Sequence, residues 1–324
     1  MPFTIKVVYD RSVSAAPAGF KATVNAVVHF FETHFTAPVT ISIGVGYGEV
    51  DHRPLGPGNL GQSSYNLYSY NYSDITAALA AHATTSADHA ALASLPVLSP
   101  VDGSFWLSQA QARALGLLGD TGGVDGSIGF AAASNFTFNR SLGVKAGSYD
   151  FFGAVAHEIS EVMGRFLLVG STTDGTPNSY SLLDLFHFSS AGNRDFSGFS
   201  GTQPGYFSIN NGLTSLGRFN SNPNGDFGDW AGIVGNNAFR AFTPPGVLNR
   251  ISAADLREMD VLGWGRLVIA PAQARHSLAQ FHHPTGAHEG HPAGNAGAYW
   301  AEGRAEPVSL HHSVHSSIGD WHIA

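Results

Sequence analysis

Residues 150–165 read D-F-F-G-A-V-A-H-E-I-S-E-V-M-G-R, and the interpretation of the chain starts from this stretch. Its apolar residues recur every three or four positions, which predicts an amphipathic helix that packs against a core. Asp150 is expected to cap the start of the helix and Gly164 to end it. On such a helix His157 and Glu161 lie on the same side, one turn apart.

The spacing of His157, Glu158 and Glu161 is typical of a zinc site. In metalloproteases with the pattern H-E-x-x-H, the two histidines bind zinc and the glutamate activates a water molecule. Here Glu161 replaces the second histidine, and a carboxylate binds zinc at nearly the same distance as an imidazole. The alternative is a surface helix with solvated glutamates, but the apolar residues around the pair favour a buried site.

A third zinc ligand has to come from elsewhere, because Leu167 stands where metzincins place theirs. The segment 181–189, S-L-L-D-L-F-H-F-S, predicts a strand or extended segment. In a strand, Asp184 and His187 face opposite sides. An aspartate between leucines needs a partner, either a metal ion or an arginine. We rank Asp184 ahead of His187 as the third ligand and leave open that neither is one.

The composition limits the classes of function. With 43% hydrophobic and 12% charged residues, the 324-residue chain is expected to fold around a core. A formal charge of −8 makes nucleic acid a poor partner, and the absence of cysteine leaves histidines and carboxylates as metal ligands. No apolar run is long enough to span a membrane.

The order of predicted elements indicates an α+β fold. Strands are predicted over 4–9, 39–47 and 126–132, with a long amphipathic helix over 17–35 between the first two. Shorter helices are predicted over 73–82, 108–118 and 252–263. This order resembles the N-terminal half of zincin metalloproteases, in which the last strand before the active helix is an edge that pairs with an extended substrate.

Several C-terminal features have two interpretations. Asn210-Asn211-Gly212 predicts a hairpin between 206–209 and 213–219. Asn220, Asn222, Asn224 and Asp226 alternate before Asp229 as in a weak calcium loop, although an Asx-rich turn is the simpler interpretation. Met259 could lie under a zinc site as in metzincins, but its spacing favours a core position.

The region from about residue 266 differs in composition from the rest. It contains nine of the 16 histidines, separated by small residues and prolines, and is expected to be largely disordered. Trp300 and Trp321 suggest that parts of it dock on the folded domain. The expected organisation is therefore a domain over 1–265, with subdomains 1–165 and 166–265, and a histidine-rich tail over 266–324.

Three blocks together resemble a family of bacterial secreted metalloproteases with an H-E-I-x-E-V-M-G-R active helix. They are H-E-I-S-E-V-M-G-R at 157–165, L-D-L-F-H-F-S at 183–189 and M-D-V-L-G-W at 259–264. Weaker matches, among them Y-F-S-I-N-N-G at 206–212 and G-D-F-G-D-W at 225–230, extend the resemblance over about residues 3–265. It implies a zincin-like, metzincin-related fold with His157, Glu158 and Glu161 on the family's motif. His187 stands where the family usually has arginine, so Asp184 is the matching candidate.

The expected function is zinc-dependent peptide hydrolysis by a monomer, with Glu158 as general base and His157, Glu161 and Asp184 as zinc ligands. The alternatives are a catalytically idle zincin scaffold that acts as an extracellular binding protein, and an adhesin-like protein that uses Ca²⁺. The chain has no N-terminal signal peptide, so the expected secretion is non-classical, with a cytoplasmic location as the alternative.

Overall fold

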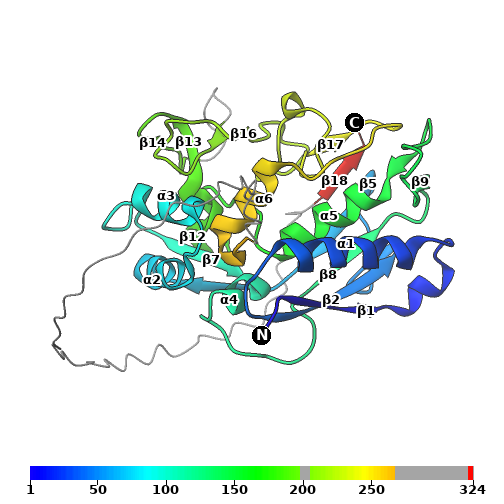
Figure 1. The fold of residues 1–324 in the computed structure, drawn as a ribbon, viewed down its shortest axis with the longest axis horizontal. Helices are drawn as coiled ribbons and strands as arrows, with labels where there is room; N and C mark the ends of the chain where they lie inside the picture. Colours follow the sequence, from blue (N-terminus) through cyan, green and yellow to red (C-terminus); the bar gives the residue numbers. More distant parts are fainter. Residues whose placement is uncertain (198–204, 267–319, 324) are drawn as a thin grey trace, which may run out of the picture. The chain divides into compact units, whose positions relative to one another are not determined.

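The computed structural model describes residues 1–197, 205–266 and 320–323 (Figure 1). These residues belong to one compact unit, an α+β fold with six α-helices and several mixed sheets. Most of the histidine-rich tail lies outside the described residues, as does Trp300. None of the helices in the described ranges is long and apolar enough to cross a membrane.

The largest sheet has the strand order β1-β2-β8-β5-β18-β17. The three predicted strands are confirmed as β1 (Thr4–Tyr9), β2 (Thr40–Tyr47) and β8 (Gly126–Phe130), and they run parallel. β5 (Asn59–Ser64) pairs with β8 in the antiparallel direction. Because β8 is paired on both sides, the expectation that the strand before the motif helix forms the sheet edge is wrong.

Two short strands from the C-terminal half of the chain complete this sheet. β18 (Asp320–Ile323) pairs antiparallel with β5, and β17 (Phe242–Thr243) pairs parallel with β18. Figure 1 shows β18 in red between these two strands. A strand that includes Trp321 therefore comes from the tail, as the tryptophans suggested, and the sheet combines segments from both ends of the sequence.

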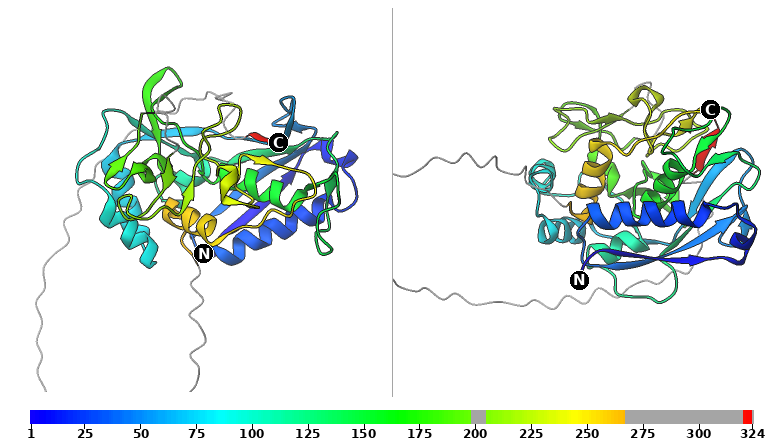
Figure 2. Two further views of the ribbon diagram at one scale, coloured as in Figure 1. Left: turned by 90° about the horizontal axis from the view of Figure 1, so that it is seen from above. Right: turned by 45° about the vertical axis from the view of Figure 1, so that its right-hand side comes forward.

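Two helices pack side by side on the sheet. α1 (Phe20–His34) and α5 (Phe151–Val162) contact each other, and α5 also contacts β5 and β8 (Figure 2). Aromatic rings fill the contact, and the ring centroids of Phe20 and Phe151 are 4.9 Å apart. The predicted motif helix is thus confirmed, and its apolar residues place it in the core.

The start of α5 differs from the sequence-based expectation. The Asp150 side chain makes no capping hydrogen bond to the helix. Its Oδ2 atom instead accepts from the backbone N–H of Asn249 at 2.9 Å and lies 3.2 Å from Arg140 Nη1. At the other end, Gly164 adopts a left-handed φ of 99° just after the helix, as predicted.

Smaller elements surround this centre. The predicted helices over 73–82 and 108–118 are confirmed as α2 (Tyr72–His82) and the shorter α4 (Gln109–Ala114), and α3 (Ser86–Ser94) follows α2. The remaining strands are β3 (Glu49–Val50), β4 (Arg53–Pro54), β6 (Leu67–Tyr70), β7 (Ser104–Ser108), β9 (Phe136–Thr137), β10 (Tyr149–Asp150), β11 (Ser171–Thr173), β12 (Thr176–Ser181), β13 (His187–Ser190), β14 (Asn193–Arg194), β15 (Tyr206–Phe207) and β16 (Gly217–Arg218).

The predicted features of the C-terminal part are largely confirmed. β15 and β16 pair as the two arms of the expected hairpin. α6 (Ala253–Met259) begins with a capping box, in which the side chains of Ser252 and Asp255 each accept a hydrogen bond from the other residue's backbone N–H. Met259 is fully buried in the hydrophobic core, in agreement with its spacing.

Candidate metal centre

Helix α5 carries three polar residues into an apolar environment. His157 and Glu158 are fully buried, and Glu161 is 1% exposed. Each offers a donor atom, and these three atoms lie within 4.8 Å of one another. The structure therefore brings together the three residues of the H-E-x-x-E pattern.

The imidazole of His157 is oriented by a backbone carbonyl. Its Nδ1 atom lies 2.8 Å from the oxygen of Ala238, which only accepts hydrogen bonds, so Nδ1 carries the proton. Nε2 is directed to two acids, with Glu161 Oε1 at 3.0 Å and Asp229 Oδ1 at 3.3 Å. Asp229 therefore occupies the position that the sequence analysis expected Asp184 to fill.

Asp229 follows a loop that is held together by one amide. The Asn220 Nδ2 group donates to the carbonyl oxygens of Asn222, Gly225 and Asp226 at 2.9–3.0 Å. The side-chain oxygens of Asn220 and Asn222 accept backbone N–H groups two residues further on. These contacts are Asx turns, so the oxygens that suggested a calcium loop already serve the backbone.

Asp184 and His187 are not brought to this centre. The Asp184 carboxylate accepts from the backbone N–H groups of Leu168, Val169 and Ser181 at 2.6–3.0 Å. These bonds bend the expected strand 181–189 into a 3₁₀ turn over Leu183–Phe186, followed by β13. The His187 Nδ1 atom is hydrogen-bonded to the Asp195 carbonyl. Asp184 thus stabilises a loop, and the predicted strand is confirmed over 187–189, in β13, but is wrong over 183–186.

Arg165 links the two acids that face His157. Its Nη1 atom is 2.5 Å from Asp229 Oδ1 and its Nη2 atom is 3.3 Å from Glu161 Oε1. Its guanidinium also lies over the ring of Phe239, 4.6 Å from the centroid. At 1% exposed, Arg165 is the most deeply buried lysine or arginine in the described part of the chain.

Negative charge exceeds positive charge in this buried region. Glu158, Glu161, Asp229 and Glu258 are each at most 1% exposed, and Arg165 is the cation that opposes them. Burial raises the pKa of Glu258 well above its usual value, with the charge of Arg165 opposing, and burial also raises the pKa of Asp229. Acidic groups outnumber basic groups in this region, and a bound divalent cation would offset the difference.

The protonation of Glu161 follows from its neighbours. Burial alone would raise its pKa, but the charges of His157 and Arg165 and the hydrogen bond from Ser63 lower it below the usual value. Ser63 Oγ donates to Glu161 Oε2 at 2.9 Å from strand β5. Glu161 is therefore an anion with one oxygen held by the sheet and the other directed to His157.

Asp226 and the second oxygen of Asp229 extend the site. Glu161, Asp226 and Asp229 also offer donor atoms within 4.8 Å of one another. Asp229 Oδ2 is buried and has no hydrogen-bond partner within the described residues. A buried carboxylate oxygen without a partner is costly, which favours a bound cation at this position.

Two separations between donor atoms are compatible with zinc. In a tetrahedral site with bonds of about 2.0–2.1 Å, neighbouring ligand atoms are about 3.3 Å apart. The two distances from His157 Nε2, 3.0 and 3.3 Å, are close to this value. A set of one imidazole and two carboxylates is also among the ligand sets that zinc accepts, so His157, Glu161 and Asp229 could hold the ion.

Glu158 lies directly against strand β5. A Cβ atom placed on Gly61 would be 2.3 Å from Glu158 Oε1. Only glycine leaves room for this carboxylate, which therefore sits between the helix and the backbone of β5. Gly61 and Ser63 are two residues apart on one face of β5, so the strand contacts both glutamates of the motif.

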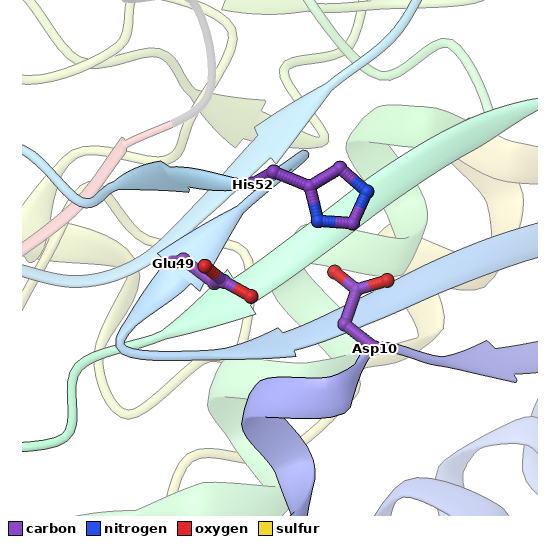
Figure 3. A group of neighbouring side chains, drawn as sticks. All are labelled: Asp10, Glu49 and His52. Carbon is purple, nitrogen blue, oxygen red and sulfur yellow. The ribbon is translucent and has the colours of Figure 1, made fainter.

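A second group of possible metal ligands lies at the C-terminal ends of strands β1 and β2. Asp10, Glu49 and His52 converge there, as Figure 3 shows. Asp51 and His52 have positive φ values of 48° and 61° in the turn between β3 and β4. His52 is exposed and the two acids are half-buried, so solvent can satisfy these groups. The buried group on α5 is the stronger candidate.

Another pair of acids lies beside α6, away from the motif. Asp88 and Asp260 line a small recess together with His82. Asp260 is 2% exposed and accepts a hydrogen bond from Thr85 Oγ1 at 2.9 Å. Burial and the charge of Asp88 raise the pKa of Asp260 to about 6, despite that hydrogen bond.

Asp260→Asn is expected to stabilise the protein at neutral pH. The folded state binds the Asp260 proton more tightly than the unfolded state does, so stability falls as the pH rises from about 4 to about 6 and then stays level. The substitution removes this loss and should increase the free energy of unfolding by about 1–2 kcal/mol at pH 7.5. Urea unfolding at pH 7.5 and pH 4 measures it, and an equal gain at both values would contradict the assignment.

No family model, curated protein or solved structure matches this chain.

Proposed function

We propose that the protein is a zinc-dependent hydrolase of peptide bonds, with a zincin-like arrangement of helix and sheet. His157, Glu161 and Asp229 would hold the ion. The observation that carries this proposal is the convergence of two buried carboxylates on His157 Nε2, at 3.0 and 3.3 Å, in a region with excess negative charge. The H-E-I-S-E-V-M-G-R resemblance supports peptide hydrolysis as the reaction.

The residues of the site would have separate roles in the reaction. Zinc, when bound, supplies Lewis-acid polarisation of the substrate carbonyl. Glu158 would take the proton from the attacking water and transfer it to the leaving amine. Ala238 fixes the orientation of His157, and Ser63 fixes that of Glu161. Ligand orientation by such neighbours is a general feature of metal sites.

The main alternative is a scaffold without metal. The 2.5 Å contact between Arg165 and Asp229 favours it, because a buried ion-pair network could hold these acids without zinc. In that case Arg165 would hold Glu161 and Asp229 in place through this network. The protein would then act by binding rather than by hydrolysis.

Metal analysis of purified protein separates the two candidates. We expect about one zinc per chain after dialysis, and its loss in His157→Ala and Asp229→Asn, since each removes a ligand. Asp184→Asn is the matched control: it disturbs a buried aspartate outside the centre and should keep the zinc while lowering stability. Zinc that survives in Asp229→Asn but not in Asp184→Asn would overturn the assignment.

A further inference from the structure

The strand β18 lies between β5 and β17, next to the candidate site. Its register with β5 pairs Asp320 with Gln62, Trp321 with Gly61 and His322 with Asn59. Gly61 is the residue against which the Glu158 carboxylate lies. The backbone of β18 therefore passes β5 at the level of the proposed general base, and β18 also contacts α5.

Strand β17, which lies on the other side of β18 from β5, is also connected to the site. β17 pairs with β18 through Phe242 and Thr243. Four residues before Phe242 is Ala238, whose carbonyl orients His157. Strand β5, on one side of β18, thus contacts Glu158 and Glu161. Strand β17, on the other side, follows the residue that contacts His157. An extended chain between β5 and β17 therefore contacts the helix that carries the site.

The pairing of β18 with each of its neighbours is short. Its register with β5 is interrupted between Trp321 and His322, and two residue pairs join it to β17. By contrast, β1 and β2 share six consecutive pairs, and β5 and β8 share four. Each lost backbone pair costs little, because the exposed groups can bond to another strand or to water. Displacement of β18 therefore breaks five residue pairs, three with β5 and two with β17.

We propose that the gap between β5 and β17 is a binding site for extended peptides, antiparallel to β5, and that β18 is its internal occupant. The peptide site itself does not depend on the proposed function. Only the interpretation of the bound peptide as a substrate rests on it. Strand addition to a sheet edge supplies affinity through main-chain hydrogen bonds and tolerates varied sequences. Tethering raises the effective concentration of β18 to about the millimolar range, so an external peptide has to compete with it.

The test uses the full-length chain with Trp321→Pro and His322→Pro together. Successive N–H groups of a strand point to opposite edges, so two consecutive prolines remove one donor toward each neighbouring strand. A matched control carries Ala301→Pro and Glu302→Pro, which leave β18 unchanged. The probe is a fluorescein-labelled peptide of residues 316–324, and binding is measured by fluorescence anisotropy in the presence of a chelator.

We expect the double-proline chain to bind the probe at least tenfold more tightly than the wild type or the control does. Equal binding by all three chains, or no binding by any, would overturn the proposal. If the prolines prevent folding, a protease site inserted near residue 290 allows the wild-type tail to be cut after purification. The labelled peptide should then exchange with the released strand, and failure to exchange would also overturn the proposal.

Activity separates this inference from the proposed function. The double-proline chain with zinc should cleave a casein-type substrate several-fold faster than the wild type, because the site beside Glu158 is open. Probe binding without cleavage in any variant would leave the peptide site standing and remove the hydrolase. Cleavage without probe binding would support the hydrolase and overturn the peptide site.

Discussion

Glu158→Gln is expected to reduce cleavage of a casein-type substrate by about 10²–10⁴-fold, the usual contribution of a general base. Glutamine has the same shape as glutamate, so it fits the space that Gly61 leaves between α5 and β5. Its amide cannot accept a proton from water, however. Because the proposed ligands are His157, Glu161 and Asp229, the variant should keep its zinc.

Two measurements on Glu158→Gln are needed together, namely the cleavage rate and the zinc content. Glu49→Gln is a suitable control, since it removes a half-buried carboxylate from the group shown in Figure 3 and should leave both values unchanged. Full activity in Glu158→Gln would exclude Glu158 as the base. Loss of zinc would indicate that Glu158 is itself a ligand.

Arg165→Met is expected to destabilise the metal-free protein by about 3–5 kcal/mol. Methionine fills a similar volume but leaves the carboxylates of Glu161 and Asp229 without their shared guanidinium. Breaking a buried ion pair by removing one partner typically has this cost, because the remaining charge is uncompensated. Zinc should restore much of the loss, since a ligand at a thousand times its Kd contributes about 4 kcal/mol.

Urea unfolding with a chelator and with zinc measures this effect. Arg113→Met is the matched control, because Arg113 also forms a close ion pair, with Asp125 at 2.5 Å, outside the candidate site. Both variants should lose stability in the chelator, but zinc should stabilise Arg165→Met more than Arg113→Met. An equal response of the two to zinc would mean that the acids beside Arg165 do not bind the ion.

The sequence identified the helix of the candidate site but not the whole donor set. His157 and Glu161 are one turn apart, so local periodicity alone was enough to place them together. Asp229 comes from a loop far along the chain, and its position depends on contacts such as those of Asn220, which no periodicity expresses. The stretch G-D-F-G-D-W contains Asp229, but the asparagines before it were interpreted as an Asx-rich turn, with a weak calcium loop as the alternative.

Asp184 and β18 show two other limits. The alternation in 181–189 predicted a strand, but the Asp184 carboxylate accepts three backbone N–H groups and bends the segment into a turn. The tail was judged by its composition, which is a property of the whole region and does not reveal a four-residue strand. In the segment 181–189, tertiary hydrogen bonds override the local preference.

The loop before Asp229 depends on one side-chain amide. Asn220 is 6% exposed, and its single amide donates to three carbonyl oxygens. An aspartate at this position would have no donor for those carbonyls and would add a negative charge to an acidic loop. The orientation of Asp229 therefore depends on a residue that lies outside the proposed donor set.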